Sequence, residues 1–389
     1  MNISRLILCL ALASAEPVLA QKEAADQKAK DLPEFNKFLL LESKVDTTAN
    51  VSFGDFDGDG HLDLLLVKGR HWPIVDRVLL GDGRGGIRTE YDLGPAADRS
   101  YTGAVADFNG DRLPDIAVSN DHPDKKLIYL NDGKGHFTVD SEFGIPQWPT
   151  RNMSVADINN DGPPDLILAN RGRAGKTSNY YCLNEGKGKF TRDCIAFAPY
   201  PATTITPADF NKDGIVDLIV PYRDKGQSYV YLGSKTYTYS DSSRVPFGPP
   251  DATIRIAATA DFNRDNLADI VTVDERKGVD LYLGQKDHTF TRISLADEKV
   301  LPYALAVADL NNDGNTDVIV GHGEAPSTVF FNDGSGQRFT PIYFGDAKGT
   351  VYGFAVGDFN EDGNPDIAAA RSDATNVLYF GARMSTKRK

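Results

Sequence analysis

The sequence predicts an all-β protein, a seven-bladed β-propeller with four-stranded blades, closed by an N-terminal strand that completes the last blade. Three observations support this fold class. An acidic nine-residue motif recurs seven times at intervals of 48–52 residues. Short apolar runs separated by Gly- and Asp-rich turns fill each interval, which is typical of propeller blades. Sustained helical periodicity is absent after the first 20 residues.

The first 20 residues have the features of a secretory signal peptide. Arg5 supplies a positive start, residues 6–13 form an apolar core, and residues 18–20 form a small-residue cleavage site. The apolar stretch is too short to span a bilayer, so we expect an exported protein, secreted or periplasmic, without a membrane span. Residues 21–34, rich in Lys, Glu, Asp and Ala, are expected to form a flexible leader.

The propeller is expected over residues 35–381, and the second repeat illustrates its strands. Residues 103–106 enter the acidic loop, 116–118 leave it, 127–130 follow, and 137–139 come after a Gly-rich turn. The last repeat stops at residue 381, before the basic tail of residues 382–389. The unpartnered segment 35–41 is therefore expected to complete the last blade, which removes exposed sheet edges.

Two cysteines remain after the signal peptide. Cys182 and Cys194 flank the turn of residues 184–189, so that a hairpin there would place them opposite each other. An oxidising compartment favours one local disulfide, and two free thiols are the alternative.

The acidic motif predicts a cation site in each repeat. Counted from its first Asp, each motif has oxygen-bearing side chains at positions 1, 3, 5 and 9, whose charges would repel one another without a cation. Carboxylate and amide oxygens suit Ca²⁺ better than Mg²⁺, which requires stricter octahedral geometry. Zinc is disfavoured because no His or Cys side chain occupies these four positions. An array of metal-free Asx turns is the alternative. The side-chain candidates are Asp55, Asp57, Asp59, Asp63, Asp107, Asn109, Asp111, Asp115, Asp157, Asn159, Asp161, Asp165, Asp209, Asn211, Asp213, Asp217, Asp261, Asn263, Asp265, Asp269, Asp309, Asn311, Asp313, Asp317, Asp358, Asn360, Asp362 and Asp366.

Position 6 of the motif is expected to be Gly, because a tight ligand loop needs a backbone conformation that is costly for other residues. Five repeats have Gly there, while the second has Arg112 and the fifth has Asn266. Asn tolerates the left-handed conformation better than Arg does. The sequence therefore predicts five calcium sites and up to seven, with the second repeat as the weakest candidate.

At this point the sequence resembles the FG-GAP/VCBS repeat family, whose best-known members are the calcium-binding propellers of integrin α chains. The resemblance covers about residues 35–381. It implies calcium loops between the first two strands of each blade on one face, here called the lower face. It also implies that the main-chain carbonyl at position 7, such as that of His61, is a ligand, and that the ions are structural.

The opposite, upper face is where the sequence predicts a ligand site, because loops there are free to vary. Two sets of positions are expected at the upper strand ends. The residues six before each motif are Ala49, Tyr101, Arg151, Thr203, Arg255, Tyr303 and Tyr352, and the residues five after each motif include Tyr222, His322 and Arg371. Adjacent loops add Arg70, His71, Trp72, His122, Arg171, Arg173, Arg223 and Arg276.

From these positions we predict a ligand-binding set of Tyr101, Arg151, Tyr222, Arg255, Tyr303, His322, Tyr352 and Arg371. Arginines pair with carboxylate or sulfate, so an anionic sugar would suit them. Ordinary rim residues that close a central channel are the alternative.

Three functions compete. The regular repeats and the lack of a nucleophile motif favour a non-catalytic binding or adhesion module for extracellular glycan or protein. The second is a polysaccharide lyase, with Arg371 or Arg255 neutralising a uronate, and His322 with Tyr303 or Tyr352 acting as base and acid. The third is a scaffold for a protein partner. Hydrolase, zinc-protease and nucleotide-binding motifs are absent, and the sequence leaves the oligomeric state open.

The charge balance first argues against anionic partners, since the formal net charge is −13, and nucleic-acid binders present basic faces. Positions 1, 3, 5 and 9 of the seven motifs hold 22 of the 55 acidic residues, which leaves 33 against 42 basic residues for everything else. Seven bound Ca²⁺ ions would bring the chain to +1. An anionic extracellular glycan is therefore compatible with the composition, whereas nucleic acid is not expected.

Overall fold

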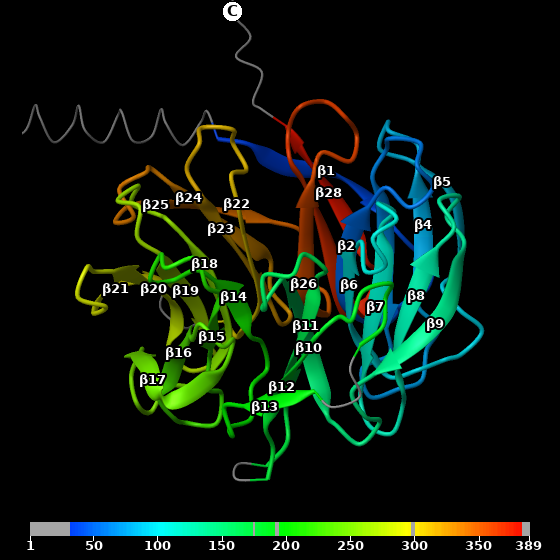
Figure 1. Cartoon of the computed structure of the whole chain (residues 1–389). Coiled ribbons are helices and arrows are strands. Elements are labelled where there is room, and N and C mark those ends of the chain that lie inside the picture. The colour runs from blue at the N-terminus through cyan, green and yellow to red at the C-terminus, as the bar shows by residue number, and fades with distance from the viewer. Residues whose placement is uncertain (1–31, 174–175, 191–193, 297–299, 383–389) are drawn as a thin grey trace, which may run out of the picture.

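The computed structural model describes residues 32–173, 176–190, 194–296 and 300–382, and every regular element in them is a β-strand (Figure 1). Five sheets have four strands each, paired in chain order. They consist of β6 (Ser100–Ala106), β7 (Asp115–Asn120), β8 (Lys126–Asn131) and β9 (Phe137–Phe143); β10 (Thr150–Ala156), β11 (Asp165–Asn170), β12 (Asn179–Cys182) and β13 (Ile195–Phe197); β14 (Thr206–Ala208), β15 (Asp217–Val220), β16 (Ser228–Gly233) and β17 (Tyr239–Phe247); β18 (Ile254–Ala260), β19 (Asp269–Asp274), β20 (Gly278–Gly284) and β21 (Phe290–Ala296); and β22 (Pro302–Ala308), β23 (Asp317–His322), β24 (Ser327–Asn332) and β25 (Phe339–Phe344).

The other eight strands form one sheet. They are β1 (Glu34–Leu40), β2 (Asp46–Gly54), β3 (Asp63–Lys68), β4 (Arg77–Gly81), β5 (Ile87–Asp92), β26 (Thr350–Gly357), β27 (Asp366–Ala374) and β28 (Val377–Ala382). The prediction of seven separate four-stranded blades is therefore wrong: the described residues form five such blades and one eight-stranded sheet. The reason is the length of β27, which pairs with β26 and β28 and also reaches Asp46 and Thr47 of β2.

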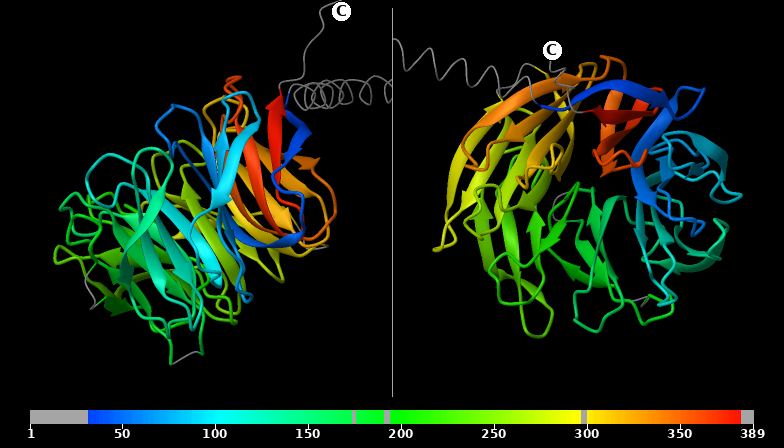
Figure 2. Two further views of the ribbon diagram at one scale, coloured as in Figure 1. Left: turned by 90° about the vertical axis from the view of Figure 1, so that its right-hand side faces the viewer. Right: turned by 90° about the horizontal axis from the view of Figure 1, so that it is seen from above.

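The two ends of the chain meet in this eight-stranded sheet. β1 pairs antiparallel with β28, with Lys37 opposite Phe380, which is the pairing expected from the early end of the last repeat. The view from above shows the sheets arranged around a common centre, with the blue N-terminal strand beside the red C-terminal strand (Figure 2). Pairing of the first and last strands closes the ring and leaves no gap between the ends.

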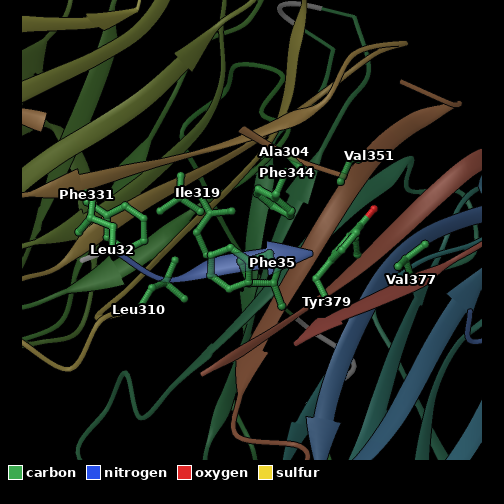
Figure 3. Close-up of a cluster of buried hydrophobic side chains, with 13 residues drawn as sticks. Leu32, Phe35, Ala304, Leu310, Ile319, Phe331, Phe344, Val351, Val377 and Tyr379 are labelled. Atoms are coloured by element: carbon green, nitrogen blue, oxygen red, sulfur yellow. The ribbon is translucent and has the colours of Figure 1, made fainter. Parts of the chain in front are cut away.

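A hydrophobic cluster stabilises the pairing of the two chain ends. Phe35 of β1 packs against Phe344 with ring centroids 5.4 Å apart, and Phe344 packs against Tyr379 at 5.1 Å (Figure 3). Leu32 is also buried in this cluster. The predicted leader therefore ends earlier than expected, because Leu32 is in the core and Glu34 begins β1.

The second strand of each repeat is almost entirely buried, as in β3, β7 and β11. Each of these strands lies between two neighbours of its own sheet and is covered on both faces by adjacent sheets, so its sequence is a short continuous apolar run. The first strands of successive repeats contact one another and therefore surround the centre of the ring.

The predicted disulfide is confirmed, because Cys182 at the end of β12 is bonded to Cys194. The predicted signal peptide and most of the leader fall in residues 1–31, and the tail beyond Ala382 falls in 383–389, so these predictions lie outside the described residues. None of the described elements is a helix able to cross a membrane.

Candidate functional site

The acidic loops on the lower face share one hydrogen-bonded conformation. The N–H at position 6 donates to the carboxylate at position 1 in all seven loops, for example from Gly60 to Asp55 at 3.1 Å and from Gly314 to Asp309 at 2.7 Å. In six loops the N–H at position 7 donates to the carboxylate at position 5. The loops thus hold their carboxylates in a repeated arrangement.

The second and fifth loops adopt this conformation without Gly at position 6. Arg112 has φ 71° and Asn266 has φ 66°, and both donate their N–H to the position-1 carboxylate at 2.8 Å. The left-handed conformation is costly for Arg, yet the loop closes as it does elsewhere. The second loop has the same closing hydrogen bond as the other loops, so weaker cation binding there would not be caused by a different backbone conformation.

The Asp at position 9 has a role that sequence reasoning missed. All seven of these side chains are completely buried, namely those of Asp63, Asp115, Asp165, Asp217, Asp269, Asp317 and Asp366. One carboxylate oxygen accepts the N–H of position 2 and the other accepts an N–H at the end of the third strand, as from Leu310 and Asn332 to Asp317 at 2.9 Å each. Each carboxylate therefore ties its loop to the neighbouring hairpin.

The first loop fits a hard cation. One carboxylate oxygen each from Asp55, Asp57 and Asp63 lies within 4.8 Å of the other two, which matches ligands 2.3–2.6 Å from a shared Ca²⁺. The Arg88 guanidinium lies 2.5 Å from Asp57 and 3.0 Å from Asp59. It supplies positive charge beside carboxylates that would otherwise repel one another.

The upper face has a pocket of about 490 Å³ at the centre of the ring. All seven residues six positions before the motifs line it: Ala49, Tyr101, Arg151, Thr203, Arg255, Tyr303 and Tyr352. From the adjacent loops, Arg70, His71, Arg171 and Arg223 line it as well. These loop residues were missing from the predicted ligand set, and the available signal was that each lies within three residues of the end of a second strand.

A β-bulge directs six of these side chains toward the pocket. In each innermost strand except β14, the register with the second strand skips one residue: Ala49, Tyr101, Arg151, Arg255, Tyr303 or Tyr352. A bulge leaves one residue unpaired and turns its side chain. The propeller thus presents the same strand position to its centre in every one of these repeats.

Three members of the predicted ligand set do not line this pocket. Tyr222 packs on Tyr200 with ring centroids 5.9 Å apart, and the Nδ1 of His322 lies 2.8 Å from the carbonyl of Pro326. Arg371 is buried and paired with Asp346 at 2.5 Å. His322 and Arg371 lie on second strands and Tyr222 lies just after one. Second strands lie farther from the centre than the innermost strands, so the structure does not bring these three residues together with Tyr101 or Arg255.

Arginines and tyrosines alternate along one half of the pocket. The Arg70 guanidinium lies 3.7 Å from the ring centroid of Tyr352 and 5.8 Å from that of Tyr101. Arg255 lies 4.4 Å from the centroid of Tyr303, and Arg151 lies 4.4 Å from that of Tyr101. These cation–π contacts hold the guanidinium groups in place while leaving their N–H groups to bind other partners.

Positive charge exceeds negative charge around the pocket. Arg151 pairs with Asp121 at 2.7 Å and Arg171 with Asp224 at 2.6 Å, while Arg223 and Arg255 share Glu275 at 2.5 and 2.9 Å. Burial, and then the nearby Arg223, lower the pKa of Arg255, against the influence of Glu275. Arg70 forms no ion pair with a described residue. Five arginines therefore face three carboxylates.

Four residues that line the pocket each have a buried polar side-chain atom without a hydrogen-bond partner among the described residues. These atoms are the Nε atoms of Arg70 and Arg171 and the Oγ1 atoms of Thr203 and Thr204. Ten such side-chain atoms are found in the described structure, so four of them belong to residues of one pocket. Unpaired buried polar groups are costly, so polar groups beside the pocket are left unsatisfied in the described structure.

A histidine and a tyrosine also meet in the pocket. The Nε2 of His71 lies 3.1 Å from the Oη of Tyr101, and its Nδ1 lies 3.6 Å from Asp121. Burial, followed by Arg151 and Arg70, lowers the pKa of His71, while Asp121 opposes the shift. His71 therefore favours its neutral form, in which it can donate or accept a proton.

The ring of sheets, the repeated acidic loops and the central pocket define a β-propeller built from repeats. The chain belongs to the FG-GAP-like repeat family, whose repeat matches residues 55–118, 107–168, 157–220, 209–272, 261–320 and 309–369. The match is to six repeats of the general family and not to integrin α chains in particular. No curated protein sequence matches the chain significantly.

Solved structures with a similar fold include BBS1N in complex with ARL6DN, which is 13% identical with a TM-score of 0.61 and covers 90% of this chain and 98% of its own. A streptogramin B lyase is 12% identical with a TM-score of 0.59, covering 89% and 97%. Virginiamycin B lyase from Staphylococcus aureus is 11% identical with a TM-score of 0.57, covering 88% and 98%. At these identities the likeness extends to the fold alone.

Proposed function

We propose that this chain is an exported, calcium-stabilised β-propeller that binds an anionic extracellular glycan in its central pocket without cleaving it. One observation carries the proposal: five arginines line the central pocket against three carboxylates, and Arg70 forms no ion pair with a described residue. Arginine N–H groups bind carboxylate or sulfate, and hydroxyl groups both donate to and accept from sugar hydroxyls.

The lower-face loops offer carboxylate, amide and carbonyl oxygens, which are the ligands that Ca²⁺ prefers. The carboxylates and amides at positions 1, 3, 5 and 9, with the carbonyl at position 7, would hold the ion in each loop. The ion would neutralise clustered carboxylates such as Asp55, Asp57 and Asp63. It would thereby fix the hairpins whose opposite ends present the pocket, so we assign it a structural role.

The contact between His71 and Tyr101 favours a second candidate, a polysaccharide lyase. Such an enzyme would use an arginine to neutralise a uronate carboxylate, a base to remove the adjacent proton and an acid to protonate the leaving oxygen. His322 and Arg371 lie outside the pocket. A lyase site would therefore use His71 and Tyr101 with Arg70 or Arg151.

A screen against arrayed neutral, uronate-containing and sulfated oligosaccharides separates these functions, followed by ultraviolet detection of unsaturated uronate with each ligand found. We expect binding that is confined to charged glycans and produces no new absorbance. New absorbance would contradict the non-catalytic assignment and establish the lyase. Failure to bind any charged glycan would contradict the glycan proposal and favour a scaffold for a protein partner.

A further inference from the structure

A second, basic hollow adjoins the central pocket on the upper face. It measures about 310 Å³ and is here called the side groove; its lining is Arg171, Arg223, Asp224, Lys225, Thr253, Glu275 and Arg276. Arg171 and Arg223 also line the central pocket. The two hollows are therefore separated by a wall made of side chains that face both of them.

Ion pairs between neighbouring blades build this wall. Arg171 follows β11 and binds Asp224, which follows β15, through two hydrogen bonds of 2.6 and 2.7 Å. Arg223 reaches Glu275, which follows β19, at 2.5 Å. The guanidinium groups are thus fixed in position, and the Nε of Arg171 remains without a partner among the described residues.

The far side of the side groove carries two more cations. Lys225 and Arg276 are exposed and form no ion pair with a described residue. Outside the groove, Asp251 is paired with Lys277 at 2.9 Å, and Lys277 together with Lys225 lowers the pKa of Asp251. Four cations therefore face Asp224 and Glu275 in the side groove, so it has the same excess of positive charge as the pocket.

We infer that the side groove is a second subsite for the same ligand, which is a linear polyanionic glycan running from the central pocket across the Arg171–Arg223 wall. The inference rests on the proposed function and narrows its ligand to a chain with several charged sugars. A single charged sugar would meet Arg70 and the threonine hydroxyls, whereas Lys225 and Arg276 are positioned for charges farther along the chain. Hydroxyls of Thr203 and Thr204 favour a sugar chain over an acidic peptide, whose side chains offer acceptors only.

The dependence of binding affinity on oligosaccharide length tests whether the side groove is a second subsite. The full chain is titrated with disaccharides and hexasaccharides from two series, oligogalacturonates and heparin oligosaccharides, at one fixed salt concentration. The wild type is expected to bind the hexasaccharide of at least one series about tenfold more tightly than the disaccharide. The double variant Lys225→Gln/Arg276→Gln is expected to reduce this ratio to about twofold and to leave disaccharide affinity unchanged.

The control variant Arg84→Gln/Lys134→Gln removes the same charge from lower-face turns and is expected to keep the wild-type ratio. Equal affinity for both lengths, or an equal loss for both in the groove variant, would overturn the side groove while leaving the pocket proposal intact. No binding of either length in either series would instead refute the proposed function. Hexaglutamate binding as tightly as the hexasaccharide, with the same loss in the groove variant, would overturn the choice of glycan.

Discussion

Removal of calcium by excess EDTA is expected to lower the melting temperature by on the order of 10 °C or more. A ligand that binds only the folded state stabilises it by about 2.7 kcal/mol per site at a concentration 100 times its Kd. At least five loops have the predicted ligand set, and each joins two strands whose packing supports the next blade. The loss of all ions therefore removes stabilisation from every part of the ring.

Differential scanning calorimetry with and without EDTA measures this shift. Re-addition of Ca²⁺ is expected to restore the transition, whereas Mg²⁺ at the same concentration is expected to restore little, because it prefers stricter octahedral geometry and keeps more of its water. An unchanged transition in excess EDTA would contradict structural calcium. It would leave the metal-free array of Asx turns as the account of the loops.

Replacement of Asp317 by Ala is expected to destabilise the fold by about 3 kcal/mol or more. The carboxylate is fully buried and accepts the N–H groups of Leu310 and Asn332. Its removal leaves two buried donors without acceptors, at about 1–3 kcal/mol each, and deletes one of the proposed calcium ligands as well. Chemical denaturation in the presence of Ca²⁺ measures the free energy of unfolding.

The conservative variant Asp317→Asn separates the two roles of this side chain. Burial raises the pKa of Asp317 to about 7 in the absence of a cation, so the charge itself opposes folding there. Asp317→Asn keeps one acceptor and removes that charge, so it is expected to be milder than Asp317→Ala in EDTA and to gain less from Ca²⁺ than the wild type does. A stability equal to the wild type for Asp317→Ala, with and without Ca²⁺, would show that these hydrogen bonds contribute nothing.

The repeats made most of the fold predictable from the sequence. The acidic motifs located the lower loops, and the spacing of short apolar runs located the strands between them. The sheet count was not predictable in the same way, because it depends on backbone bonds between β2 and the last residues of β27. No residue type distinguishes the residues that form those bonds, so the sequence does not show that β27 extends far enough to pair with β2.

The sequence predicted part of the candidate site, and the strand on which each residue lies explains which part. Position six before each motif lies at the start of an innermost strand, and all seven of these residues reach the pocket. Position five after each motif lies on or just after a second strand, where Tyr222, His322 and Arg371 have partners away from the pocket. The bulges that direct Tyr101 or Arg255 inward leave no signal in a single sequence, because they arise from pairing between two strands.

Arg70 offers the cleanest test of the pocket. Its guanidinium is placed by Tyr352 and forms no ion pair with a described residue, so its replacement breaks no salt bridge in the described structure. A hydrogen bond to a charged group contributes about 1.5–3 kcal/mol, which is roughly a tenfold to hundredfold change in affinity. We expect Arg70→Gln to have the melting temperature of the wild type, which would confirm that the fold is retained.

The central claim, that the upper pocket binds an anionic glycan through its unpaired arginine, is tested most directly by calorimetric titration of the wild type and Arg70→Gln. The ligands are the charged hexasaccharide found by the screen and a neutral glucan hexasaccharide. We expect the wild type to bind only the charged chain, and Arg70→Gln to bind it at least tenfold more weakly. Equal binding of the neutral chain, or an unchanged affinity in Arg70→Gln, would contradict the claim.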